Sequence, residues 1–161
     1  MRHARLISFA LVLAACVGCD HASKQAAEAL LASGEPIALL GDAIRFQLVS
    51  NPGAFLSLGA ALPETLRGAL FLGLVPVLLG AVLVGFVLRS GATRVDLLAV
   101  ALVIGGGVAN WLDRLAHGGA VTDFVSVGVG LLRTGIFNFA DVAITAGVLL
   151  LLVSTRAARE K

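Results

Sequence analysis

Long apolar runs alternate with short polar segments along the chain, and this pattern sets the first expectation for its architecture. The apolar runs cover about residues 6–31, 68–88, 95–112 and 136–154. A helix needs roughly 20 mostly apolar residues to cross the hydrocarbon core of a membrane, so each run is long enough or nearly so. The first run reaches this length only if the polar segment 20–28 continues its helix. The pattern predicts a membrane protein that is all-α in its spanning part, with four transmembrane helices in a single domain over residues 1–161.

The polar segment at about residues 34–64 has a different pattern. Its fragment AIRFQLVS alternates loosely between apolar and polar positions and is followed by an Asn-Pro-Gly turn sequence. This pattern is typical of a half-buried β-strand. We therefore expect a small β-sheet platform outside the membrane. A second segment, HGGAVTDFVSVGVGLLRTG, lies between the third and fourth runs, and its glycines are typical of a mobile loop or a short strand.

Composition supports the membrane interpretation and excludes several classes of protein. Hydrophobic residues make up 58% of the chain, the mean hydropathy is +0.98, and only 14% of residues are charged. A soluble domain of this size is far less apolar. The net charge of +2 is too small to indicate binding to nucleic acid.

The distribution of charge predicts the orientation in the membrane. With the N-terminus in the cytoplasm, the inner segments carry seven basic and two acidic residues, a net charge of +5. The outer segments carry five basic and eight acidic residues, a net charge of −3. Because basic residues beside helix ends favour the cytoplasmic side, we expect a multi-pass protein with both termini in the cytoplasm. The acidic residues and the β-sheet platform would then be extracytoplasmic.

The stretch LAACVGC in the first run permits two interpretations. It is similar to the cleavage site of a lipoprotein signal peptide, with Cys16 or Cys19 as the lipidated residue. Three further spanning runs follow, however, and small residues are common wherever membrane helices pack closely, which favours helix packing. A Cys-x-x-Cys metal or redox site would need further ligands nearby, and the sequence offers none. We expect neither a metal nor a cofactor.

Asp20 and Lys24 follow this stretch directly and lie on one face of the predicted helix. Charged residues at the membrane end of a helix are costly unless they are paired or functional. A salt bridge that fixes the helix end and a contact with substrate are both consistent with this spacing.

Four aspartates are expected at the outer ends of the helices, namely Asp20, Asp113, Asp123 and Asp141. Asn110 and Asn138 each stand three residues before an aspartate, so each can share a helix face with that carboxylate and orient it. His21 and His117 are isolated in the sequence and are typical of interfacial histidines.

Clustered carboxylates permit hydrolysis or conduction. Two carboxyls close together cannot both ionise, so one keeps a proton while the other accepts a proton from water. Conduction would need polar groups along the whole path, and the inner halves of the predicted helices contain almost no polar side chains. The pattern therefore favours a site over a channel. A proton-coupled transporter, which would need Asp20 as much as Asp141, and a structural assembly protein, which would tolerate Asn at every Asp, are the alternatives.

Five motifs together resemble one known family. They are DHASK after the first apolar run, NPGAF in the outer loop, GGGVANWLDR at the end of the third run, VTDF in the following loop and FNFAD before the fourth run. In this order they resemble lipoprotein signal peptidase, also called signal peptidase II, over essentially the whole chain. The outer-loop motif of the family commonly has a second Ala, whereas here Phe55 follows Ala54 directly.

The resemblance implies an aspartic endopeptidase that cleaves prolipoproteins before the diacylglyceryl-modified cysteine, in the bacterial inner membrane and near its outer face. It implies that Asp123 and Asp141 are the catalytic pair. Matching support or substrate-binding positions are Asp20, Lys24, Asn51, Gly53, Asn110, Asp113, Arg114, Asn138 and Ala140. The partners would be prolipoprotein substrates and membrane lipid, without nucleic acid, and we expect a monomer.

The residues alone do not distinguish Asp123 from Asp113 as a catalytic group. The resemblance favours Asp123, and the Arg114 beside Asp113 suits a structural ion pair. For Asp141, an acid that only stabilises the start of a helix is the alternative to a catalytic role.

Overall fold

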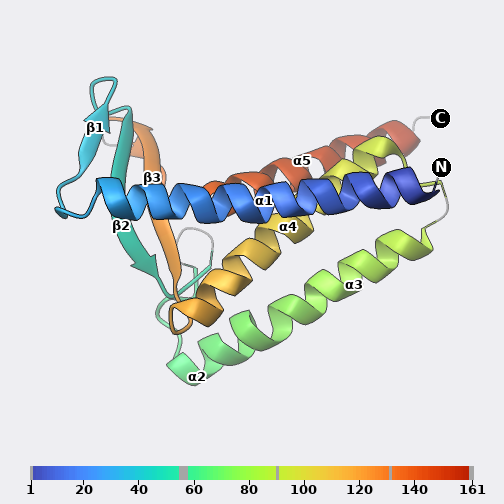
Figure 1. Cartoon of the computed structure of the whole chain (residues 1–161), viewed down its shortest axis with the longest axis horizontal. Helices are drawn as coiled ribbons and strands as arrows, with labels where there is room; N and C mark the ends of the chain where they lie inside the picture. The colour runs from blue at the N-terminus through green and yellow to red at the C-terminus, as the bar shows by residue number, and fades with distance from the viewer. Residues whose placement is uncertain (1, 55–57, 90, 131, 160–161) are drawn as a thin grey trace.

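The computed structural model describes residues 2–54, 58–89, 91–130 and 132–159, so Phe55 of the outer-loop motif lies outside the described residues. Long helices run side by side along the molecule, and a small sheet stands across one end of them (Figure 1). Both termini lie at the opposite end. The fold class is confirmed: apolar helices carry a small antiparallel sheet.

The helices match the apolar runs in order but begin and end at different residues. They are α1 (Arg2–Leu30), α2 (Glu64–Arg67), η2 (Gly68–Leu74), α3 (Val75–Leu88), α4 (Arg94–Ala116) and α5 (Phe139–Arg159). By length and composition three helical segments can span a membrane, His3–Leu30, Glu64–Leu88 and Arg94–Ala116. The apolar part of α5 is shorter, Phe139–Thr155, but its 21 residues extend over about 31 Å. Helices α4 and α5 extend beyond the C-terminal ends of their apolar runs, and α4 begins with a side-chain cap.

The start of α4 shows such a cap. Thr93 Oγ1 accepts from the N–H of Asp96, while the Asp96 carboxylate accepts from the N–H of Thr93, a reciprocal capping box. Asp96 also accepts a hydrogen bond of 2.6 Å from the Ser154 hydroxyl of α5. This cap therefore joins α4 and α5 at the end of the bundle opposite the sheet.

The segment Glu64–Leu88 is one continuous helix with an irregular centre. Between α2 and α3, η2 is a π-helix in which the N–H of Val75 bonds the carbonyl of Leu70. Pro76 follows at once and has no N–H for the Leu72 carbonyl four residues earlier. The Trp111 indole of α4 donates to that carbonyl at 3.2 Å. The helix is thus π-helical just before Pro76, and the carbonyl that the proline leaves free is satisfied by a neighbouring helix, as a membrane requires.

The sheet has four antiparallel strands in the order β1 (Ile37–Leu39), β2 (Ile44–Asn51), β3 (Val121–Val129) and β4 (Leu132–Arg133). Strand β2 therefore confirms the alternation in AIRFQLVS. The later segment, expected to be a mobile loop or a short strand, contains the nine-residue strand β3. Pairing of β2 with β3 places Val49 opposite Asp123 and Asn51 opposite Val121.

Close helix contacts depend on small residues. A Cβ on Gly106 of α4 would lie 2.5 Å from the Ala140 carbonyl oxygen of α5, and one on Gly105 would lie 2.7 Å from Cys16 Cβ of α1. These glycines let α1, α4 and α5 approach closely. Cys16 is buried at this contact and Cys19 is exposed, within one continuous helix. The packing interpretation of these cysteines therefore fits the geometry.

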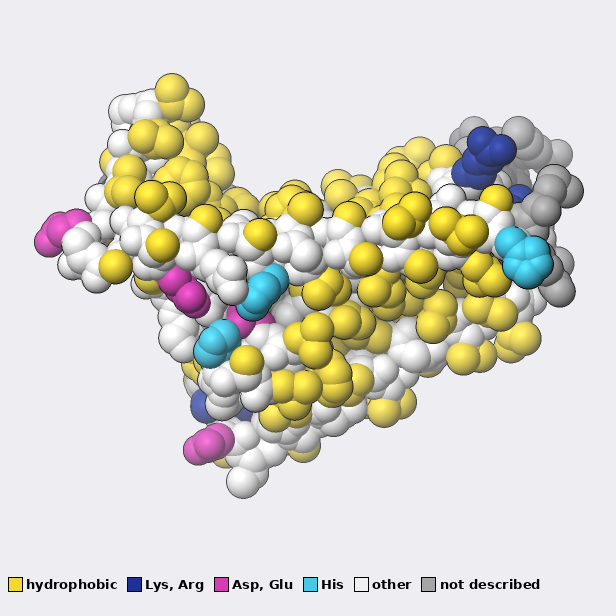
Figure 2. All heavy atoms as spheres, in the orientation of Figure 1, with side chains coloured by type: hydrophobic (Ala, Val, Ile, Leu, Met, Phe, Trp, Pro, Cys, Tyr) yellow, Lys and Arg dark blue, Asp and Glu magenta, His cyan; other side chains and the backbone are white. Residues whose placement is uncertain are grey.

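The surface of the helices suits a lipid environment. On the face drawn in Figure 2, hydrophobic side chains cover the middle of the helices and charged side chains lie near the two ends. No described residue of α2, η2 or α3 is buried within the chain. Because a bilayer would cover these apolar residues, such exposure is expected for a membrane helix and not for a soluble one.

Candidate active site

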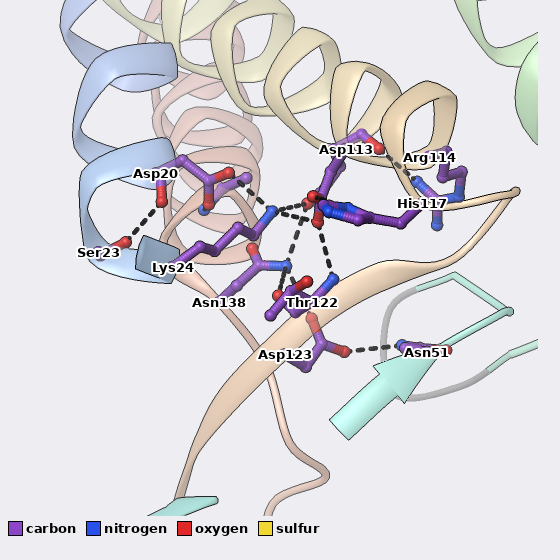
Figure 3. Close-up of polar contacts among 12 residues, drawn as sticks. Asp20, Ser23, Lys24, Asn51, Asp113, Arg114, His117, Thr122, Asp123 and Asn138 are labelled. Carbon is purple, nitrogen blue, oxygen red and sulfur yellow. Dashed lines mark hydrogen bonds and ion pairs between the residues drawn. The ribbon is translucent and has the colours of Figure 1, made fainter. Parts of the chain in front are cut away.

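A buried polar cluster lies where the sheet meets the ends of the helices (Figure 3). Its members come from α1, α4, α5, β2 and β3, which are distant in the sequence. The candidate residues in it are Asp20, Lys24, Asn51, Asn110, Arg114, Asp123, Asn138 and Asp141, each buried. Gly53, Asp113 and Ala140 bond or border the same cluster. The structure therefore brings together every site residue that the sequence predicts.

Asp141 is fixed by the start of its own helix. Asn138 precedes α5, and its Oδ1 accepts from the Asp141 N–H at 3.0 Å. In return an Asp141 carboxylate oxygen accepts from the Asn138 N–H at 3.3 Å. This is a capping box built from Asn and Asp, and it holds the carboxylate in one orientation. The expectation that Asn138 orients Asp141 is confirmed.

Asp123 is held by one amide from the neighbouring strand and another from the start of α5. Asn51 of β2 donates to one carboxylate oxygen at 2.8 Å and Asn138 donates to the other at 2.7 Å. Asp123 is only 1% exposed. Burial, which penalises the charged form, raises its pKa to about 6, and the negative charge of Asp141 acts in the same direction. The hydrogen bonds from Asn51 and Asn138 oppose this shift.

Amide groups connect the two carboxylates. The Nδ2 of Asn138, which binds Asp123, also donates to Asn110 Oδ1 at 3.0 Å, and Asn110 Nδ2 donates to Asp141 at 3.0 Å. Asn110 therefore orients Asp141 across the helix interface. The sequence had suggested that Asn110 orients Asp113, but no hydrogen bond joins those two described side chains. A side chain three residues away on a helix can equally point to a neighbouring helix.

Lys24 is one of two buried cations among the described residues of the cluster, the other being Arg114. Its ammonium lies 2.7 Å from Asp20 and 2.9 Å from Asp113, and it donates to Asn110 Oδ1 at 3.2 Å. Asp20 also accepts from the N–H of Ala140 in the first turn of α5, at 2.9 Å. Asp20 and Lys24 thus form the expected ion pair, and through it α1 is bonded to α4 and α5. This geometry favours the salt-bridge interpretation over direct contact with substrate.

Asp113 connects α4 to β3. Besides Lys24, its carboxylate bonds the Thr122 N–H at 2.7 Å and His117 Nδ1 at 2.6 Å. The expectation that His117 is isolated is therefore wrong, and its spacing of four residues from Asp113 was the signal for this pair. Asp113 does not line the groove described below, which supports its assignment as a structural residue.

Arg114 fixes the outer loop. Its guanidinium donates to the Gly53 carbonyl at 2.6 Å and to the Asn110 carbonyl at 3.2 Å. It also lies over the ring of Phe71, 5.0 Å from the ring centroid. Asn51 Oδ1 accepts from the Gly53 N–H at 2.9 Å, so the same turn that binds Arg114 also orients Asn51 toward Asp123. Sequence reasoning did not identify Phe71, which no polar motif accompanies.

Asp123 and Asp141 both line a groove of about 440 Å³ whose remaining walls are mostly apolar, from Phe71 and Val75 to Ile144 and Val148. A second groove, also of about 440 Å³, runs along the other side of α5 and includes Phe137 and Val142. Asp141, Thr145 and Leu149 border both grooves. Spaced four residues apart on α5, they form a ridge with a carboxylate at its outer end.

Among the described residues, no group of three or more His, Cys, Asp and Glu side chains could hold a metal ion. The carboxylates are instead surrounded by amide and ammonium donors. Such a pair can share one proton, and the ionised member can then accept a proton from water.

A membrane fold with buried carboxylates beside a groove fits one class of protein, the aspartic-type membrane hydrolases. A family model described as "Signal peptidase (SPase) II" matches residues 12–156. The chain therefore belongs to the signal peptidase II family, and it is a multi-pass bacterial membrane protein.

Its relatives agree with this assignment. A protein named lipoprotein signal peptidase from Rhodococcus jostii (strain RHA1) is 34% identical over 158 residues, which cover 95% of this chain and 74% of that protein. One of the same name from Azoarcus sp. (strain BH72) is 40% identical over 153 residues, covering 94% and 85%. A solved bacterial membrane enzyme superposes with a TM-score of 0.77 at 22% identity, over 93% of this chain and 88% of that chain. At that identity the structural likeness supports the fold alone.

Proposed function

We propose that this chain removes signal peptides from prolipoproteins by cleaving the peptide bond before a diacylglyceryl-modified cysteine, with Asp123 and Asp141 as the catalytic pair. The observation that carries the proposal is the arrangement of these two buried carboxylates, which border one groove and are tied together through Asn138 and Asn110. Membership of the signal peptidase II family and the names of the relatives supply the substrate class.

The pair would share one proton between its two carboxyls. The ionised carboxylate takes a proton from a water molecule as that water attacks the scissile carbonyl carbon. The protonated carboxyl donates its proton to the carbonyl oxygen, and a proton then passes to the leaving amine as the C–N bond breaks. Because the two groups are coupled, the protonation states belong to the pair. The raised pKa of Asp123 supports its holding a proton near neutral pH better than an ordinary aspartate does.

The two grooves suit the shape of such a substrate. A lipidated prolipoprotein has an apolar signal helix on one side of the scissile bond and two acyl chains on the cysteine on the other side. Both grooves are mostly apolar, and they meet at the ridge that Asp141 begins. In our proposal each groove accommodates one of these apolar parts, so that the bond between them lies beside the dyad.

The proposal also includes the location of the reaction. The excess of basic residues at the end opposite the sheet supports cytoplasmic termini in the bacterial inner membrane. The dyad would then lie near the outer face, where the sheet and the polar cluster are found. The proposal further takes the chain to act as a monomer without a metal or cofactor.

The test is cleavage of a purified prolipoprotein by the full chain in detergent, with products identified by mass spectrometry. We expect cleavage of the diacylglyceryl-modified substrate directly before the modified cysteine. The same prolipoprotein without the diacylglyceryl group is the matched control, and its cleavage should be much slower. No cleavage of the modified substrate, under conditions in which an established signal peptidase II cleaves it, would refute the proposal.

A further inference from the structure

The end of the bundle opposite the dyad contains a groove that the proposed reaction does not use. It has a volume of about 560 Å³ and lies between α1, α3 and the start of α4. Leu6 and Phe9 of α1, Leu83 and Phe86 of α3 and Leu97 of α4 are among its apolar walls. The rings of Phe9 and Phe86 stack with their centroids 6.3 Å apart. The groove is therefore an apolar slot, and the Phe9–Phe86 contact joins α1 to α3 beside it.

Two arginines lie at this groove. Arg5 is exposed and uses one Nη1 hydrogen bond of 3.3 Å to the Ala92 carbonyl. Arg89 is 44% exposed, and its guanidinium lies 3.9 Å from Asp96. A guanidinium has five N–H donors, so both arginines keep donors that are free to bind an anion.

Asp96 is the acid that pairs with Arg89 among the described residues, and its carboxylate is buried. Asp96 is 1% exposed, and its carboxylate accepts hydrogen bonds from the Thr93 N–H and the Ser154 hydroxyl. It therefore caps α4 and bonds α5, and its 3.9 Å ion pair with Arg89 engages one of the five N–H donors of that guanidinium. An apolar slot with cationic groups beside it complements a lipid whose head group is an anionic phosphate.

We propose that this groove binds one acidic phospholipid, with an acyl chain in the slot and the phosphate between Arg5 and Arg89. No described residue of α3 is fully buried within the chain, and Phe86 is only half-buried beside Phe9, so a bound lipid would add packing to α3 at this end. The other end of the same continuous helix brings Phe71 and Val75 to the dyad groove. The lipid would thus hold a helix that also forms a wall of the active site. This inference does not depend on the proposed reaction.

The experiment is a titration of the detergent-purified full chain with dioleoylphosphatidylglycerol or dioleoylphosphatidylcholine, followed by native mass spectrometry. The wild type should bind one phosphatidylglycerol more tightly than phosphatidylcholine. The double variant Arg5→Gln/Arg89→Gln should weaken phosphatidylglycerol binding at least about tenfold, as expected for the loss of two phosphate contacts. A second variant, Ala92→Phe, fills the groove without changing its charge and should also weaken binding.

Arg94→Gln is the matched control, because Arg94 lies in the first turn of α4 but does not line the groove. It should bind phosphatidylglycerol as the wild type does, and all variants should melt near the wild-type temperature without added lipid. Equal affinity for both lipids, full binding by the double variant, or an equal loss in Arg94→Gln would overturn the proposal. A mass increment of a second chain in place of a lipid would also overturn it.

Discussion

Asn138 is hydrogen-bonded to both Asp123 and Asp141. Its side-chain oxygen accepts the N–H of Asp141 and so caps α5, and its side-chain amide nitrogen donates to Asp123 and to Asn110. An aspartate in its place would lose the amide donors, and a hydrophobic residue would lose every one of these contacts. One side chain thus fixes the start of a helix and the carboxylate of a strand at the same time.

Substitution of Asn138 separates these two tasks. Asn138→Ala should lower the free energy of unfolding by about 1 kcal/mol through loss of the helix cap. It should also lower the cleavage rate on the order of 10²-fold, because a misplaced catalytic group costs about that much. Asn138→Ser keeps a side-chain oxygen for the cap but no amide donor for Asp123, so it should regain stability and not activity. Thermal melts and cleavage rates measured together test this, and recovery of activity in the Ser variant would contradict it.

The raised pKa of Asp123 makes a prediction about stability. The folded-state pKa, about 6, is higher than the ordinary value of 3.8 that applies when the chain is unfolded. Between these values Asp123 binds more protons in the folded chain than in the unfolded chain, so its contribution to stability is largest at low pH and falls as pH rises from about 4 to about 6. The loss attributable to this group is at most about 3 kcal/mol.

Thermal melts of the wild type and of Asp123→Asn across this pH range isolate the effect. Other groups titrate in both proteins, so the difference between the two melting curves reports on Asp123. We expect the wild type to lose stability relative to the variant as pH rises. A difference that is constant with pH would show that Asp123 is not buried and desolvated as described.

At the scale of elements, the position of Asp141 depends on how closely α4 approaches α5. Gly106 permits that approach, since its Cα faces the Ala140 carbonyl and the Ile144 side chain. Ala140 is fully buried at this contact and immediately precedes Asp141. Any increase in the separation of the helices would therefore shift a dyad member relative to β3.

Gly106→Ala tests this dependence. Its Cβ would lie 2.5 Å from a backbone oxygen, a clash that only a shift of α5 can relieve. We expect a loss of about 1–3 kcal/mol in stability, as for other overpacked contacts, together with reduced cleavage. Gly80→Ala in α3 is the matched control, because a Cβ there meets nothing within 4 Å. Equal behaviour of the two variants in thermal melts and cleavage assays would show that the α4–α5 contact does not limit the site.

The elements also show what sequence patterns can and cannot predict. Apolar runs predicted the helices, because burial in lipid needs length and hydrophobicity alone. Strand β3 was left open as a mobile loop or a short strand, since its pairing partner β2 lies some seventy residues earlier and its glycines weaken the local signal. A strand that exists through long-range pairing cannot be read from a short window.

The site was predicted unevenly for a similar reason. Asn138 and Asp141 lie three residues apart, and their capping box is a local interaction that spacing reveals. The bond of Asn110 to Asp141 joins two helices, so spacing misdirected Asn110 to Asp113. Phe71 was missed because its partner Arg114 lies on another helix. His117 was judged isolated although its spacing of four residues from Asp113 on α4 could have predicted that pair.

At the scale of the whole molecule, the two ends of the helix bundle differ. The sheet end holds the buried carboxylates, amides and Lys24, while the other end holds both termini, the Asp96 cap and the arginine-lined groove. Between them the helices are apolar and largely exposed to the surroundings. In the proposed reaction, hydrolysis would therefore take place at the sheet end of the helices, where the substrate's cleavage site would have to be presented.

The most direct test of the central claim is cleavage of a diacylglyceryl-modified prolipoprotein by Asp123→Asn and Asp141→Asn, with folding checked by thermal melts. Asp42→Asn is the matched control, since Asp42 is paired with Arg45 and Arg133 in the turn between β1 and β2, apart from the groove. Asp113→Asn, in the structural network, should cleave more slowly than the wild type but remain active. Each dyad variant should fold and lose at least about 10²-fold in rate, while Asp42→Asn stays near the wild type. Folded dyad variants that retain wild-type cleavage would contradict the account.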